Sequence, residues 1–179
     1  MNVIKLLDKE FKLSITAEEI DTATKNIADR INKDLNNKDV IFLGILNGAF
    51  MFASDLLRHI TFNCQISFLK LASYQGTSNS GTVKRLIGIN ENIANKTVVV
   101  IEDIVDSGIT IEHIIKQLNG YEPADIKIAT LLLKPEAYSK AVKLDYIGME
   151  IPNDFIVGYG LDYNGYGRNL QNIYSITNN

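Results

Sequence analysis

Three carboxylates followed by small residues form the part of this sequence best suited to chemistry. They lie in the segment VVVIEDIVDSGIT, residues 98–110, where Glu102 and Asp103 follow an apolar run and Asp106 comes three positions after Asp103. Two adjacent carboxylates can accept hydrogen bonds from vicinal hydroxyl groups, and they can hold Mg²⁺ directly or through water. Asp106 lies between this pair and the small residues, so we expect it to face the reacting part of a ligand.

The small residues after the carboxylates predict a phosphate site. Ser107, Gly108 and Thr110 stand where an apolar strand gives way to an apolar helix. Such a turn presents backbone N–H groups and the positive end of the helix dipole to an anion, and the two hydroxyls add donors. Because an acidic pair repels a phosphate at close range, the joint pattern predicts a sugar phosphate whose hydroxyls meet the carboxylates. The alternative is an ordinary solvated loop with capping residues, which a lone Ser-Gly-x-Thr would favour.

The elements that must position these residues alternate between buried strands and helices. We expect strands at residues 41–46, 65–70, 85–89, 97–101, 126–133, 155–157 and 173–176, and helices at residues 16–35, 49–60 and 111–118. This alternation predicts an α/β fold with a central parallel sheet. Ligands of such sheets bind at the carboxyl ends of the strands, which directs attention to Asn47-Gly48, residues 102–110, Lys134 and the loop near Asp162. The polar stretch 73–83 has no periodicity and predicts an exposed, mobile loop.

Composition narrows the class of protein. The 179 residues include 18 basic and 21 acidic side chains, a net charge of −3, which disfavours a broad basic surface for nucleic acid. Cys64 is the only cysteine, so no intrachain disulfide can form, as is usual in a reducing compartment. Asp8 and Glu10 stand where a signal peptide would have an uninterrupted apolar segment. We therefore expect a single domain over residues 1–179, located in the cytoplasm, without a membrane partner.

Residues 98–110 resemble the phosphoribosyl pyrophosphate signature of the type I phosphoribosyltransferases. Two further segments resemble the hypoxanthine-guanine subfamily: LNGAF, residues 46–50, is similar to its pyrophosphate loop, and IPNDFIVGYGLDYNGYGRNL, residues 151–170, is similar to its C-terminal region. Lys134 matches the purine-contacting lysine of that subfamily. The resemblance implies a twisted parallel sheet flanked by helices, with a small hood built from the N- and C-terminal segments.

The resemblance also implies an activity in purine salvage. Phosphoribose would pass from 5-phosphoribosyl 1-pyrophosphate to hypoxanthine, and to guanine as a second base, giving IMP or GMP and pyrophosphate. Mg²⁺ would be the cofactor, the partners would be small-molecule substrates rather than nucleic acid, and the chain would form a homodimer or homotetramer. Two alternatives remain: a related enzyme that prefers xanthine, and a non-catalytic RNA-binding regulator that keeps the nucleotide-binding fold.

Roles for individual residues follow from the same resemblance. Asp106 would be the general base beside N7 of the purine, and Ser73 and Tyr74 would begin the mobile loop that closes over the reaction. The residues implied for phosphoribose and its 5′-phosphate are Glu102, Asp103, Asp106, Ser107, Gly108, Ile109 and Thr110. Those implied for pyrophosphate are Asn47, Gly48 and Arg168, and those for the purine are Lys134, Phe155, Ile156 and Asp162. The implied metal ligands are Glu102, Asp103 and Asp162.

The sequence departs from the family pattern at two positions. Many relatives carry lysine in the pyrophosphate loop where this chain has Asn47, and some carry a polar or basic residue in place of Ile109. Neither departure changes the expected base, Asp106. Backbone N–H groups at Asn47 and Gly48 remain available to an anion.

Overall fold

A six-stranded sheet forms the centre of the molecule. The computed structural model describes residues 3–75 and 82–177, and its side chains outside residues 72–87. The strands are β3 (Val40–Leu46), β4 (Gln65–Gln75), β5 (Thr82–Ile87), β6 (Thr97–Val105), β7 (Asp125–Leu133) and β8 (Tyr146–Glu150), in the order β5-β4-β3-β6-β7-β8. Neighbours from β4 to β8 pair in parallel, and only β5 runs antiparallel, at the edge beside β4. The predicted α/β fold with a central parallel sheet is therefore confirmed.

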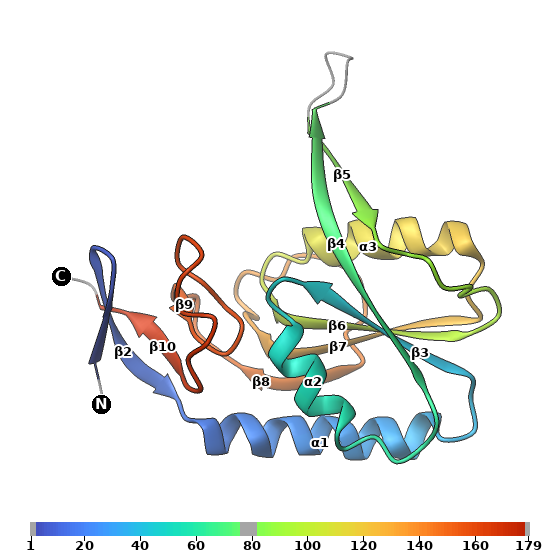
Figure 1. The fold of residues 1–179 in the computed structure, drawn as a ribbon, viewed down its shortest axis with the longest axis horizontal. Helices are drawn as coiled ribbons and strands as arrows, with labels where there is room; N and C mark the ends of the chain where they lie inside the picture. The colour runs from blue at the N-terminus through green and yellow to red at the C-terminus, as the bar shows by residue number, and fades with distance from the viewer. Residues whose placement is uncertain (1–2, 76–81, 178–179) are drawn as a thin grey trace.

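Helices cover both faces of this sheet. Helices α1 (Ala17–Leu35) and α2 (Phe50–Leu57) lie on one face, and α3 (Ile109–Leu118) lies on the other, followed by a short 3₁₀ turn, Asn119–Tyr121 (Figure 1). Successive residues of β6 feed opposite cores: Val99 and Ile101 pack with α1 and α2, whereas Val98 and Val100 pack with α3. A strand covered on both faces needs apolar residues at every position, which explains the unbroken apolar run at the start of β6.

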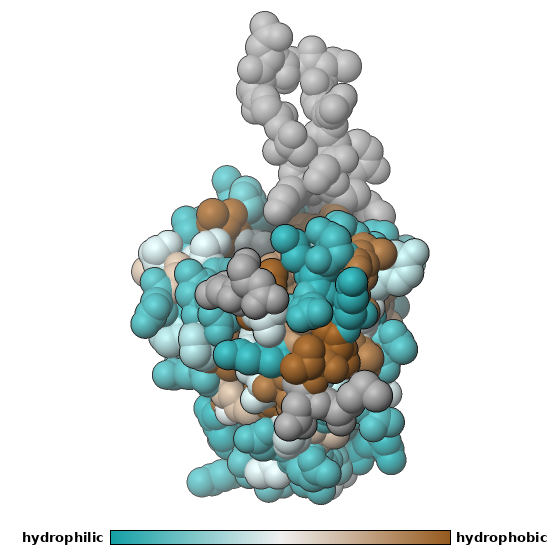
Figure 2. Space-filling model, turned by 90° about the vertical axis from the view of Figure 1, so that its left-hand side faces the viewer, coloured by the Kyte–Doolittle hydropathy of each residue, from teal (hydrophilic) through white to brown (hydrophobic). Residues whose placement is uncertain are grey.

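A second, smaller sheet joins the two ends of the chain. It consists of β1 (Val3–Leu6), β2 (Lys9–Ile15), β10 (Ile173–Ile176) and β9 (Ile156–Val157), in that spatial order, with antiparallel neighbours. Its buried centre contains Phe11, Val157 and Tyr174. Viewed from this end, the molecule is mostly hydrophilic, with hydrophobic side chains exposed in several places among the hydrophilic ones (Figure 2). This sheet is the hood that the resemblance implied.

The elements predicted from the sequence are present, but β1, β2 and β8 were not predicted, and two stretches expected as loops belong in part to strands. Glu102 and Asp103 were expected in a loop, yet β6 continues through them to Val105 because its end still pairs with β7. The loop expected at residues 73–83 is also wrong in part, since residues 73–75 belong to β4 and pair with the first residues of β5. The remaining residues, 76–81, lie outside the described part of the chain.

The start of α1 generates a test of local stability. The Thr16 hydroxyl accepts a hydrogen bond from the Glu19 backbone N–H at 3.3 Å, and Glu19 Oε2 accepts one from the Thr16 N–H at 2.8 Å. Thr16→Ala removes half of this capping box, so we expect the free energy of unfolding to fall by about 1 kcal/mol in urea titrations. The control is Thr22→Ala, inside the same helix, where the hydroxyl only donates to the Glu18 carbonyl. An equal loss in both variants would contradict the capping explanation.

Candidate active site

Two buried carboxylates end the central strand of the large sheet. Glu102 is 6% exposed and Asp103 is 9% exposed, because β6 lies between β3 and β7 and its end is covered on both sides. Burial raises the pKa of Glu102 well above its ordinary value, and the neighbouring charge of Asp103 adds to the effect. Burial likewise raises the pKa of Asp103 to about 6. Both groups therefore disfavour the ionised state until a cation or a hydrogen-bond donor meets them.

The turn after these carboxylates forms the start of α3. Gly108 caps the helix with φ of 82°, and a β-carbon there would lie 2.5 Å from the ring of Tyr138. Only glycine satisfies both the left-handed backbone and this close approach. The carboxylates and the turn line one cavity of about 290 Å³, formed by Glu102, Asp103, Ile104, Val105, Asp106, Ser107, Gly108, Thr110 and Ile111. Of the predicted phosphoribose residues, only Ile109 is not among those lining it, and its side chain is about half exposed.

Lys134 reaches Asp106 from the neighbouring strand. It directly follows β7, it is 7% exposed, and its Nζ lies 3.4 Å from Asp106 Oδ2. Because β6 and β7 are parallel neighbours, their carboxyl ends lie side by side, and the Lys134 N–H donates to the Val105 carbonyl. The structure thus brings together the predicted base and the predicted purine-contacting lysine.

The predicted pyrophosphate loop lies against the second carboxylate. The peptide bond between Leu46 and Asn47 is cis, and Gly48 follows. A β-carbon on Gly48 would lie 1.8 Å from Asp103 Oδ2, so glycine is required for this contact. On the other side, a β-carbon on Gly160 would lie 2.1 Å from the Gly48 carbonyl oxygen. The end of β3, the Asp103 carboxylate of β6 and the C-terminal loop therefore meet at the backbone of Gly48.

Asp162 and Arg168 are paired with each other in that C-terminal loop. Arg168 Nη2 lies 2.5 Å from Asp162 Oδ1, and Asp162 Oδ2 accepts a hydrogen bond from the Gly165 N–H at 2.7 Å. Arg168 also donates to the Gly160 carbonyl at 2.5 Å. Its charge partly offsets the rise that burial causes in the pKa of Asp103. A pyrophosphate on Arg168, or a cation on Asp162, must compete with this ion pair.

Phe155 presents a half-exposed ring supported by the small sheet. Its ring centre lies 6.3 Å from that of Phe11 and 6.0 Å from that of Tyr163, and the Tyr163 hydroxyl donates to Asp8 at 2.8 Å. Ile156 is buried in β9, where it pairs with Ser175 of β10. The supporting rings were not predicted, because Phe11 comes from a strand near the other end of the chain and no local pattern links it to Phe155.

Ser73 and Tyr74, expected to begin a mobile loop, lie in β4. Their backbones pair with Lys84 and Val83 of β5. Their side chains lie outside the described part of the structure.

The acidic groups suit a hard cation only in part. Among the described residues, no group of three or more His, Cys, Asp and Glu side chains is placed to hold a metal ion. Glu102 and Asp103 nevertheless supply adjacent oxygen donors. Mg²⁺ commonly takes one or two carboxylates and completes its coordination with water and substrate phosphates. The residues present therefore fit Mg²⁺ held jointly with a substrate.

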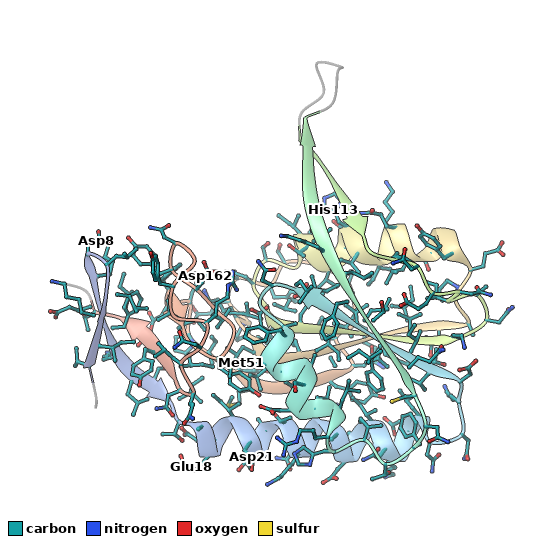
Figure 3. All side chains as sticks on the ribbon, viewed as in Figure 1. Asp8, Glu18, Asp21, Met51, His113 and Asp162 are labelled. Carbon is teal, nitrogen blue, oxygen red and sulfur yellow. The ribbon has the colours of Figure 1, made fainter. Side chains whose placement is uncertain are left out.

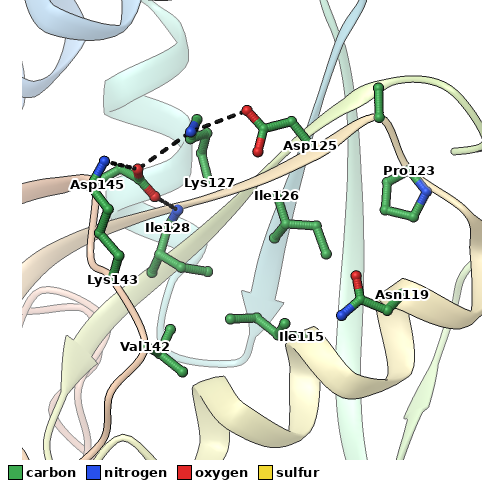
Figure 4. A pocket seen from close by; sticks show the side chains of 11 residues that line it. Ile115, Asn119, Pro123, Asp125, Ile126, Lys127, Ile128, Val142, Lys143 and Asp145 are labelled. Atoms are coloured by element: carbon green, nitrogen blue, oxygen red, sulfur yellow. Dashed lines mark hydrogen bonds and ion pairs between the residues drawn. The ribbon is translucent and has the colours of Figure 1, made fainter.

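A separate cavity of about 360 Å³ lies at the start of β7, away from the strand ends that carry these residues (Figure 4). Its charged side chains pair among themselves: Lys127 lies 3.1 Å from Asp125 and 3.6 Å from Asp145, and Lys143 lies 3.0 Å from Asp145. These pairs hold the start of β7 to the segment before β8. None of the helices within residues 3–75 and 82–177 has the length and apolar character to span a bilayer.

Comparison with known proteins agrees with this arrangement. The family model described as phosphoribosyl transferase domain matches residues 14–164. A hypoxanthine-guanine phosphoribosyltransferase from Lactococcus lactis is 38% identical over 168 residues, which cover 93% of this chain and 91% of that protein. The crystal structure of a hypoxanthine-guanine phosphoribosyltransferase from Bacillus anthracis superposes with a TM-score of 0.83 at 33% identity, covering 93% of this chain and 97% of the other.

A third similar protein is known from Trypanosoma cruzi. The structure of a hypoxanthine phosphoribosyl transferase from Trypanosoma cruzi superposes with a TM-score of 0.82 at 30% identity, covering 97% of this chain and 95% of the other. That work concerned the role of the C-terminal region on the oligomeric state and enzymatic activity.

The raised pKa of Asp103 predicts a pH-dependent stability. The pKa of Asp103 is about 6 in the folded chain, against an ordinary value of 3.8. Burying its charge therefore has no effect on stability below pH 4, where the group is protonated, and it destabilises the fold as pH rises from there through 6. Without Mg²⁺, Asp103→Asn should therefore raise the free energy of unfolding at pH 8 by up to about 3 kcal/mol and leave it unchanged at pH 4.

Urea titrations at both pH values, in EDTA, measure this difference. The matched control is Asp29→Asn, on the exposed side of α1, for which we expect no change at either pH. A gain for Asp103→Asn of the same size at pH 4 and pH 8 would show that burial of charge is not the cause.

Proposed function

Because the chain belongs to the hypoxanthine-guanine phosphoribosyltransferase family, we propose that it transfers phosphoribose from 5-phosphoribosyl 1-pyrophosphate to hypoxanthine, and to guanine as a second base. The products are IMP or GMP and pyrophosphate. The observation that carries the proposal is the shared cavity in which the buried pair Glu102 and Asp103 adjoins the turn at the start of α3. Such a cavity suits a sugar phosphate, with diol and phosphate at opposite ends. The xanthine-preferring and RNA-binding alternatives are not favoured, since the relatives reported above are named for hypoxanthine or guanine.

In this proposal the cavity holds the phosphoribosyl group. Glu102 and Asp103 accept hydrogen bonds from the ribose hydroxyls, and backbone N–H groups with the hydroxyls of Ser107 and Thr110 bind the 5′-phosphate. Mg²⁺, held by these carboxylates together with substrate oxygens, would supply positive charge to the leaving pyrophosphate. Asp162 is a further proposed ligand once it separates from Arg168.

The purine is positioned from the end of β7 and from the small sheet. Lys134 donates to the 6-oxo group, and Asp106, 3.4 Å from the Lys134 ammonium, takes the purine proton as the new bond forms. The half-exposed ring of Phe155 stacks on the base, and the Ile156 backbone reads its far edge. These roles place the base between two elements that the large and small sheets bring together.

Pyrophosphate is bound on the opposite side of the anomeric carbon. The backbone N–H groups of Asn47 and Gly48 face it, and Arg168 contributes its charge. Positive groups in this place stabilise the charge that develops on the leaving group. Because Asn47 has no charge, Arg168 carries more of this task than in relatives with a lysine.

We also propose a homo-oligomer in the cytoplasm whose partners are small-molecule substrates. Large apolar side chains at Phe50, Ile66 and Phe68 remain 39–40% exposed near one edge of the large sheet, as in a surface that another copy covers. The net charge of −3 disfavours a broad basic surface for nucleic acid.

A direct assay tests the proposed function. Purified protein is mixed with 5-phosphoribosyl 1-pyrophosphate, Mg²⁺ and one of hypoxanthine, guanine, xanthine or adenine, and nucleotide formation is followed by absorbance. We expect turnover with the first two bases, little with xanthine and none with adenine, and dependence on Mg²⁺. Absence of turnover with every 6-oxopurine would refute the proposal.

Lys134 generates a prediction about selectivity. Lys134→Ala removes the donor to the 6-oxo group, so we expect kcat/KM for hypoxanthine to fall by about 10²-fold or more while that for adenine does not, as for a lost charged hydrogen bond. Competition between the two bases in one reaction measures the ratio. Lys140→Ala, which removes an equal charge paired with Glu112 at 2.8 Å, is the control and should keep the ratio. A preserved ratio in Lys134→Ala would mean that the 6-oxo group is recognised elsewhere.

A further inference from the structure

A buried tyrosine connects the C-terminal loop to the helix that follows the pyrophosphate loop. Tyr159 is 5% exposed, and its hydroxyl donates to Asp55 Oδ2 in α2 at 2.7 Å. Burial and this hydrogen bond raise the pKa of Tyr159, so it stays a neutral donor at physiological pH. None of the roles assigned above uses this contact.

The backbone around Tyr159 is held in an uncommon conformation. Gly158, Tyr159 and Gly160 have φ values of 105°, 48° and 98°, so three successive residues lie in the left-handed region. The Tyr159 N–H donates to the Leu170 carbonyl, and the Gly160 N–H donates to the Arg168 carbonyl. A tyrosine in this region costs free energy, and such a conformation persists only where the surroundings determine it.

The last of these three residues, Gly160, forms the contact with the pyrophosphate loop. Gly160 lies against the Gly48 carbonyl, and Gly48 lies against Asp103. Gly48 and Gly160 have no side chains, so neither residue can itself hold the C-terminal loop at a fixed distance from Gly48 by a side-chain hydrogen bond. The hydrogen bond between Tyr159 and Asp55 can hold this distance. Tyr159 is next to Gly160 in the loop, and Asp55 follows Gly48 by seven residues.

The geometry of α2 transmits this bond to the pyrophosphate loop. The helix begins at Phe50, directly after Gly48-Ala49, and the Ala53 N–H donates to the Ala49 carbonyl at 2.8 Å. Asp55 therefore lies within the rigid segment that continues from the loop. Tyr159 and Asp55 also line a cavity of about 260 Å³. Its lining includes Asp21 and Met51, which are labelled in Figure 3. Water in this cavity can solvate Asp55 when the tyrosine hydroxyl is removed.

We propose that Tyr159 is a positioning residue for pyrophosphate binding, which acts through Asp55 by fixing the distance between the Asn47-Gly48 loop and Arg168. The proposal rests on the proposed function and adds a determinant of affinity for the pyrophosphate-bearing substrate. It assigns no contact between Tyr159 and the substrate. Loss of the Tyr159–Asp55 bond should weaken the affinity for pyrophosphate and for 5-phosphoribosyl 1-pyrophosphate. It should not change the affinity for the base, whose proposed contacts come from Lys134 and Phe155.

The chain offers a matched control for the test. Tyr146 is 3% exposed, and its hydroxyl also donates to an aspartate of a helix, Asp34 in α1, at 3.3 Å. It begins β8, at the end of the sheet opposite the strand ends that form the site. Tyr146→Phe therefore removes a similar buried bond without touching the loop geometry.

The experiment compares Tyr159→Phe with Tyr146→Phe and with wild type. We expect Tyr159→Phe to raise KM for 5-phosphoribosyl 1-pyrophosphate and Kd for Mg²⁺-pyrophosphate about three- to tenfold, the size expected for one lost hydrogen bond. KM for hypoxanthine and kcat should stay within about twofold, and Tyr146→Phe should leave all four constants unchanged. Asp55→Asn keeps an acceptor for the tyrosine hydroxyl and should behave as wild type, whereas Asp55→Ala should reproduce Tyr159→Phe.

The outcomes separate the two proposals. Equal effects of Tyr159→Phe and Tyr146→Phe, or an equal rise in KM for both substrates, would overturn the positioning role while leaving the transferase function intact. Calorimetry with Mg²⁺-pyrophosphate gives the binding result even for a protein without turnover. A wild-type chain that binds pyrophosphate but forms no nucleotide would count against the transferase function alone, and one that does not bind pyrophosphate would overturn both.

Discussion

The burial of two carboxylates at the end of a central strand is the constraint on which the rest of the site depends. β6 must lie between β3 and β7 to complete the core, and the same placement covers Glu102 and Asp103. Burying ionisable groups lowers the stability of the fold, and these two carboxylates add nothing to the packing of the hydrophobic core. This loss of stability is the cost of a preorganised site in which the two carboxylates can meet substrate hydroxyls and a cation. The residue that packs against Asp103, Gly48, must also be glycine, because the carboxylate leaves no space for a side chain.

A second consequence concerns how distant segments reach the same place. The ends of parallel strands supply the Asn47-Gly48 loop, residues 102–110 and Lys134 without further devices, because parallel neighbours end at one edge. The C-terminal loop is different, since it crosses from the small sheet and meets the site through left-handed residues around Tyr159. Its position is therefore set by a few specific contacts, and the Tyr159–Asp55 bond is one of these.

This difference explains what the sequence could and could not predict. The carboxylates, the turn at the start of α3 and Lys134 are local features, each directly after an apolar strand, and the structure brings them together as expected. Two other contacts join residues more than 100 positions apart in the sequence. They are the ring cluster of Phe11 and Phe155 and the hydrogen bond between Tyr159 and Asp55, which are 104 positions apart. Neither leaves a periodic pattern in the chain. β1 and β2 were missed for a related reason, because one face of this hairpin is exposed and its residues are often charged.

Local charge, rather than the net charge of −3, governs which ligand the site can accept. Two of the four acidic groups, Asp106 and Asp162, are already paired with Lys134 and Arg168. The other two, Glu102 and Asp103, have raised pKa values and so give up part of their charge without a cation. Four ionised carboxylates would repel a phosphate strongly. Because two are paired and two are partly neutral, this electrostatic repulsion is much reduced even in the unliganded protein. A cation that arrives with an anionic substrate can then ionise the buried pair, so that substrate charge and protein charge develop together.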